Sequence, residues 1–195
     1  MKYGFVKVII AVSIGTCGQP VNAEFIGELL LRDVAAEYED YGETDPGHTE
    51  FELLQDYSYR DDDGTVWTAP AESIVNGASI PRVVWTSVGG PWSGKYRNAA
   101  VIHDYLTEER PSSSEVVHRL FLDGMLKNGV SKTRANLMYA AVVTFGGKWN
   151  EAGNFVDGGD PIEMTSEDLE KLQDYLEAND PSAKEISNLQ IEDIR

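Results

Sequence analysis

Hydrophobic and polar positions alternate in a way that predicts strands in the first half of the chain. Residues 25–34 form an apolar run long enough for a buried strand. Two β-prone runs, 51–59 and 65–69, flank an Asp-Gly turn at 61–64 and predict an antiparallel hairpin. The acidic stretch 37–50 contains a Pro-Gly turn signal, so we expect an exposed loop there.

The second half has apolar residues at helical spacing. We expect a short helix that begins at Pro81, where the missing N–H of proline costs nothing. Three helices should follow, at about 95–108, 114–127 and 131–145. A last amphipathic helix is expected after Thr165, and residues 181–195 are expected to be a short helix or a frayed acidic tail.

These elements predict an α+β fold, in which a small antiparallel β-hairpin or meander packs on a three-helix bundle with an extra C-terminal helix. We expect a signal peptide at 1–23, one α+β domain at 24–160, and a C-terminal helix with an acidic tail at 161–195. No internal repeat or low-complexity segment is present.

The first 23 residues have the features of a secretory signal. Lys2 and Lys7 give a short positive n-region, residues 6–14 are mostly apolar, and small residues at 21–23 suit a signal peptidase. The run is too short for a membrane anchor, which needs about 20 apolar residues. We therefore expect a periplasmic or extracellular protein without a membrane span after cleavage. Lipidation at Cys17 is the alternative.

The net negative charge of the chain argues against anionic partners. The 195 residues include 33 acidic and 16 basic side chains, a net charge of −17. Such a surface repels phosphate backbones and anionic lipids, so we expect no nucleic-acid partner. The one cysteine lies in the predicted signal, so the mature protein would have no disulfide, and its stability would come from packing or a metal.

The candidate chemistry centres on His103 and Asp104 in the predicted helix 95–108. The spacing of apolar residues points His103 inward, and His118 lies on the next helix, so both imidazoles could reach one cleft. They could share a divalent transition metal such as zinc, with Asp104, Asp123 or a side chain from 76–79 as the third ligand. The alternative is that His103 is a core histidine with its hydrogen bonds satisfied.

Ser79 is a candidate nucleophile with His103 as its base, although a capping role is the simpler explanation for a serine before a helix. Asn76 would form a turn or reach the site. Trp92 and Tyr105 are candidates for binding a carbohydrate or peptide, with core packing as the alternative.

Several motifs occur in an order that resembles the bacterial and phage family called domain of unknown function 1353. They are Asn76 to Arg82 (NGASIPR), Trp85, the Gly-Pro loop, Ala99 to Leu106 (AAVIHDYL), Phe121, Met125, Gly129-Val130, Met138-Tyr139 and Phe145 to Gly147. The resemblance covers about 51–149. It implies that Ser79, His103, Asp104 and the positions of Asn76 and His118 converge as a polar site.

The chain departs from the family at two of these positions. The family has an aspartate where this chain has Asn76, and an acidic residue where it has His118. Two functions remain open. One is an exported, metal-assisted hydrolase acting on a cell-envelope polymer or peptide. The other is a non-catalytic periplasmic or phage-derived binding or structural protein whose polar cluster only holds the fold.

Overall fold

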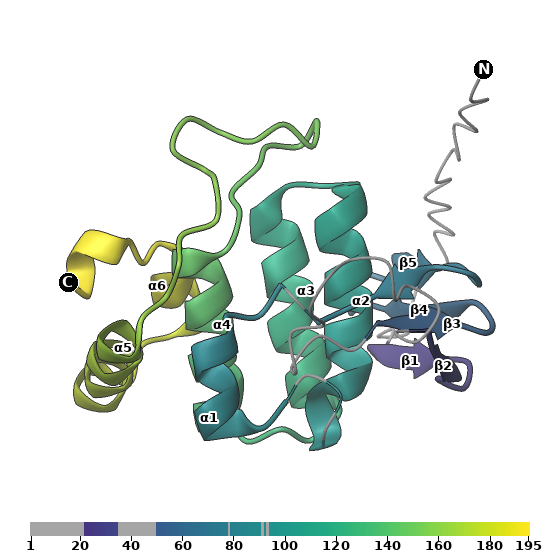
Figure 1. Ribbon diagram of the computed structural model, residues 1–195, viewed down its shortest axis with the longest axis horizontal. Coiled ribbons are helices and arrows are strands. Elements are labelled where there is room, and N and C mark those ends of the chain that lie inside the picture. Colours follow the sequence, from purple (N-terminus) through teal and green to yellow (C-terminus); the bar gives the residue numbers. More distant parts are fainter. Residues whose placement is uncertain (1–21, 35–49, 78, 91, 93) are drawn as a thin grey trace.

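The computed structural model describes residues 22–34, 50–77, 79–90, 92 and 94–195 (Figure 1). Its helices and antiparallel strands confirm the predicted α+β class. Most of the predicted signal peptide, including Cys17, and nearly all of the predicted acidic loop lie outside the described residues. Ala23, the last residue of that signal, is buried, and its N–H donates to Asp62 Oδ1 at 3.0 Å.

The strands form two small antiparallel sheets. The first has the order β1-β4-β5, with β1 at Glu24–Ile26, β4 at Tyr57–Arg60 and β5 at Val66–Ala69. The second has the order β2-β3-β6, with β2 at Leu31–Asp33, β3 at Phe51–Leu53 and β6 at Ile74–Val75. The predicted hairpin around the 61–64 turn is present as β4 and β5, which pair Tyr59 with Trp67.

The prediction of one buried strand at 25–34 is wrong. The chain turns at Gly27, whose φ of 93° lies in the left-handed region that favours glycine. The residues before and after this turn, β1 and β2, therefore join different sheets. The predicted single run 51–59 is likewise divided, into β3 of the second sheet and β4 of the first.

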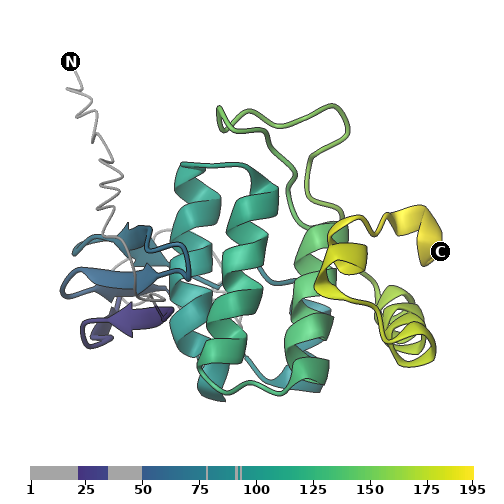
Figure 2. The ribbon, with the colours of Figure 1, turned by 180° about the vertical axis from the view of Figure 1, so that it is seen from behind.

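The helices follow the predicted order. A 3₁₀ turn at Arg82–Val84 leads into α1 (Trp85–Val88), and another at Gly94–Tyr96 leads into α2 (Arg97–Glu109). Then come α3 (Ser114–Lys127), α4 (Lys132–Phe145), α5 (Ser166–Asn179) and α6 (Ala183–Ser187), with a last 3₁₀ turn at Ile191–Asp193. In both ribbon views α2, α3 and α4 stand in a row between the sheets and the C-terminal helices (Figures 1 and 2).

Two hydrophobic clusters stabilise this arrangement. The first surrounds α4, where every residue from Ala135 to Phe145 is buried, and it includes parts of α1, α3 and α5. A helix that is buried on all sides needs neighbours all round, and α3, α5 and α6 supply them. The second cluster joins both sheets to α2 and α3, with Leu53, Tyr57 and Val101 almost fully enclosed.

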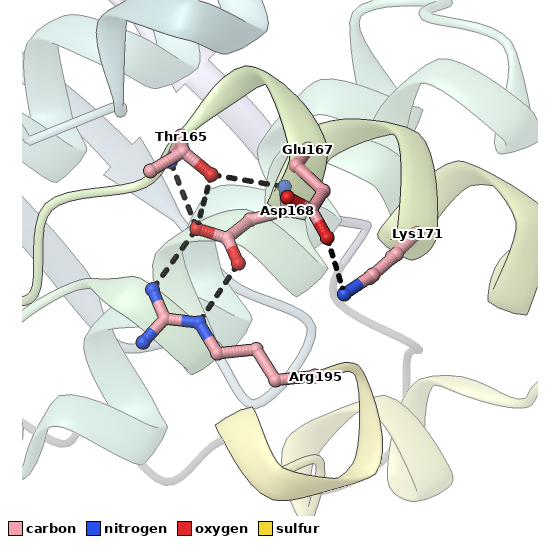
Figure 3. Close-up of polar contacts among 5 residues, drawn as sticks. All are labelled: Thr165, Glu167, Asp168, Lys171 and Arg195. Atoms are coloured by element: carbon pink, nitrogen blue, oxygen red, sulfur yellow. Dashed lines mark hydrogen bonds and ion pairs between the residues drawn. The ribbon is translucent and has the colours of Figure 1, made fainter.

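The C-terminal segment is an ordered part of the fold rather than a frayed tail, since Ile186, Leu189 and Ile194 are buried. Figure 3 shows how it is attached: Arg195 binds both carboxylate oxygens of Asp168, at 2.8 and 3.0 Å. Asp168 also forms a reciprocal capping box with Thr165, which begins α5. The neighbouring pair of Lys171 and Glu167 is far more exposed, so it contributes little stability.

This attachment fixes the chain just before α5. Residues 161–164 run beside the end of α4, where the Ile162 N–H donates to the Phe145 carbonyl at 2.8 Å. Over the described residues, no helix combines the length and the apolar character that crossing a membrane requires.

Candidate functional site

Asp104 connects α2 to the loop that follows β6. Its Oδ2 accepts hydrogen bonds from the backbone N–H groups of Asn76, at 2.8 Å, and Gly77, at 3.1 Å. Its Oδ1 accepts the hydroxyl of Ser79 at 2.5 Å. Hydrogen bonds to a carboxylate are about twice as strong as neutral ones. One side chain on α2 therefore fixes the conformation of a loop that lies 25 to 28 residues earlier in the chain.

A second polar chain runs through the two histidines. His103 Nε2 lies 2.9 Å from His118 Nδ1, and His118 Nε2 lies 3.3 Å from the carbonyl oxygen of Gly147. A carbonyl can only accept, so His118 carries its hydrogen on Nε2 and accepts at Nδ1 from His103. The chain of bonds joins α2, α3 and the segment after α4. His103 Nδ1 has no hydrogen-bond partner among the described residues.

Both imidazoles are neutral in the folded protein. Burial lowers the pKa of His118 to about 4, and the Gly147 carbonyl, which accepts its Nε2–H, only partly opposes this shift. Burial also holds the pKa of His103 well below its ordinary value, and the neighbouring His118 adds to the effect. A base with so low a pKa accepts protons poorly near pH 7.

These groups border an open pocket of about 740 Å³. Asn76 and Ser79 lie on one wall, Asp104, Thr107 and Glu108 of α2 on a second, and residues 161–164 on a third, while His118 and Gly146–Gly147 also line it. The structure thus brings four of the predicted site residues to one cavity: Asn76, Ser79, Asp104 and His118.

Three other predictions have a different outcome in the structure. His103 does not line the pocket and lies almost fully buried behind His118. Trp92 packs edge-on against Phe51, with ring centroids 4.9 Å apart, and Tyr105 packs against the same cluster. Neither aromatic ring lines the pocket, so both occupy the packing role that was their alternative.

The predicted nucleophile also has another partner. The Ser79 hydroxyl donates to Asp104, whereas His103 donates to His118, so the Ser79–His103 pair is not formed in this arrangement. The geometry places the serine in the role of a loop anchor.

The residues present do not fit the predicted metal. The nitrogens of His103 and His118 that face each other share a hydrogen, so their lone pairs do not converge on an ion. Asp104 uses both oxygens for the loop. Within the described part of the chain, no three His, Cys, Asp or Glu side chains gather as a metal-binding group.

The sequence reasoning missed part of the pocket. Thr107 and Glu108 follow Asp104 by three and four residues on α2, and this helical spacing places them on the face of Asp104. That signal could have identified them. Glu163 has no such signal, because its wall depends on the pairing of the 161–164 segment with the end of α4.

The comparisons with known proteins agree with the motif order. Residues 51–142 match the model of a family described as "Protein of unknown function (DUF1353)". The match confirms the resemblance over this segment of the chain. Ser79, His103, Asp104 and His118 all lie inside the DUF1353 segment, whereas Gly147 and the 161–164 wall lie beyond it.

Two curated relatives, both from Sinorhizobium fredii (strain NBRC 101917 / NGR234), are also described as uncharacterized. Protein y4jT is 44% identical over 99 residues, which cover 51% of this chain and 30% of the relative. Protein y4iH is 36% identical over 132 residues, which cover 66% of this chain and 55% of the relative. The chain thus spans about half or less of these relatives. No solved structure matches it significantly.

If Asp104 anchors the loop, Asp104→Ala should destabilise the protein by about 2 kcal/mol, because two backbone N–H groups and a hydroxyl lose their acceptor. Urea unfolding measures the change. The matched control is Asp123→Ala, which removes only an exposed pair with Arg119 and should cost less than about 0.5 kcal/mol. Equal, small losses in both variants would contradict the anchoring role.

The histidine pair predicts a loss of stability in mild acid. The unfolded chain binds a proton at each imidazole near pH 6.5, whereas folded His118 does so only near pH 4. The contribution is therefore fully present above pH 6.5 and falls below it, by up to about 1.4 kcal/mol per pH unit for each histidine.

Urea unfolding between pH 7.5 and 5 should show this slope, and His118→Gln should reduce it by about half. A slope that is unchanged in the variant would show that His118 is protonated equally in the folded and unfolded states.

Proposed function

We propose that the protein is a non-catalytic binding protein. Its ligand would bind in the pocket between the loop that follows β6, helix α2 and residues 161–164. The observation that carries this proposal is that the potentially reactive side chains are already engaged in hydrogen bonds within the protein. Ser79, Asp104 and His118 line the pocket, and the Ser79 hydroxyl, the Asp104 carboxylate and both nitrogens of His118 are each engaged in a hydrogen bond within the protein.

The same bonds disfavour the hydrolase. A general base needs a pKa near the working pH, and burial lowers the pKa of His118 to about 4. A serine nucleophile needs such a base within hydrogen-bond reach, and the group that Ser79 contacts is a carboxylate already shared with two backbone N–H groups. Binding makes no such demand, and walls that are fixed in advance favour it because less freedom is lost when the ligand enters.

The binding test uses a panel of muramyl peptides, oligosaccharides and short peptides, with amide NMR shifts as the readout. We expect at least one compound to shift the amides of Asn76 and Gly147, which line the pocket, and mass spectrometry to recover that compound intact. Cleavage of the compound, abolished by Ser79→Ala, would support the hydrolase and overturn the proposal.

The control for this test fills the pocket. Ile162→Trp adds bulk to an exposed pocket residue without touching either polar chain, so it should abolish the shifts. Leu54→Trp makes the same change at an exposed site outside the pocket and should leave them intact. Equal binding by both variants would place the ligand elsewhere.

We also propose export, on the basis of Lys2, Lys7 and the apolar run 6–14 with small residues at 21–23. N-terminal sequencing of the protein from a periplasmic fraction should find Glu24 as its first residue. Retention in the cytoplasm with an intact start would contradict export. A lipid on Cys17 would support the alternative.

A further inference from the structure

Three side chains that line the pocket, Ser79, Thr107 and His118, use their hydrogen-bond donor within the protein. Ser79 donates its hydroxyl hydrogen to Asp104, at 2.5 Å, and Thr107 donates its own to the His103 carbonyl, at 2.7 Å. His118 donates its one N–H to Gly147. A hydroxyl that donates keeps lone pairs, so Ser79 and Thr107 face the pocket as acceptors.

The pocket offers a ligand hydrogen-bond acceptors and negative charge. The pocket is lined by three carboxylates, Asp104, Glu108 and Glu163, against one cationic side chain, Arg82. The carboxylates of Glu108 and Glu163 make no hydrogen bond or ion pair among the described residues, and His118 is neutral near pH 7. Arg82 already lies over the ring of Trp85, at 5.7 Å from its centroid.

A ligand that satisfies such a surface must bring hydrogen-bond donors and positive charge. An alkyl ammonium has three donors and a guanidinium five, and neither has an acceptor that would meet the acceptors of the pocket. An anionic ligand would meet repulsion from two unpaired carboxylates. Apolar lining from Ile74, Val83 and Met164 suits the methylene stem of such a group.

We propose that the pocket binds a basic side chain or amine, that is, an alkyl ammonium or guanidinium cation carried on an aliphatic stem. This inference rests on the proposed binding function and names its ligand class. The decisive interactions come from Glu108 on α2 and Glu163 on the segment before α5, so the cation lies between two walls of the pocket.

The test compares N-acetyl-arginine methylamide and N-acetyl-lysine methylamide with N-acetyl-citrulline methylamide, a neutral analogue of the arginine compound with nearly the same shape. Amide NMR titration of the purified protein should show both cations shifting the amides of Asn76 and Gly147, with dissociation constants at least tenfold below that of the citrulline compound. Glu108→Gln/Glu163→Gln should weaken the cations about tenfold, since two ion pairs are lost.

Glu109→Gln/Glu170→Gln is the matched control, because it removes the same charge from exposed positions outside the pocket. It should leave both dissociation constants within about twofold. Equal weakening by the two double variants would reduce the effect to general attraction by an acidic surface and overturn the proposal.

Two further outcomes separate this inference from the binding function. Equal binding of the arginine and citrulline compounds would contradict the preference for a cation but not the binding function. Pocket shifts with only the neutral members of the panel of muramyl peptides, oligosaccharides and short peptides would have the same meaning. Absence of pocket shifts with every cation and every member of that panel would overturn both.

Discussion

The carboxylate of Asp104 is the interaction on which the arrangement of the pocket depends. In the loop after β6, the backbone N–H groups of Asn76 and Gly77 donate to a side chain of α2. Since β6 belongs to a sheet and α2 to the helical row, this acid couples the two halves of the fold. Ser79 then lies beside Asp104 because the loop is held there, and its position is a consequence of the anchor.

The adjacency of His103 and Asp104 has a structural explanation. Neighbouring residues on a helix point about 100° apart, so one side chain faces the 76–79 loop while the other faces α3. The histidine extends its contact through His118 to Gly147, which also lines the pocket. The His-Asp motif thus positions two parts of the pocket lining from one turn of α2. Neither a metal nor a catalytic dyad is needed to explain it.

Local signals predicted the helices and the 61–64 hairpin, since turn residues and apolar periodicity act over a few positions. Thr165 begins α5 with a capping box, as its sequence context indicated. Such local signals do not predict which distant strands pair. The turn at Gly27, after which β1 and β2 join different sheets, was therefore missed. The site shows the same division. Ser79, Asp104 and His118 were identified from their motifs, whereas Glu163 reaches the pocket only because Ile162 pairs with Phe145.

The hydrogen bonds that hold this pocket in shape also decide which polar groups face its interior. Two backbone N–H groups and a hydroxyl donate to Asp104, and an imidazole N–H donates to Gly147. The hydrogens therefore face inward and the lone pairs face the cavity. Because these bonds are complete without a ligand, the walls need little ordering when one binds. Rigidity and a preference for donor-rich ligands thus have one physical origin.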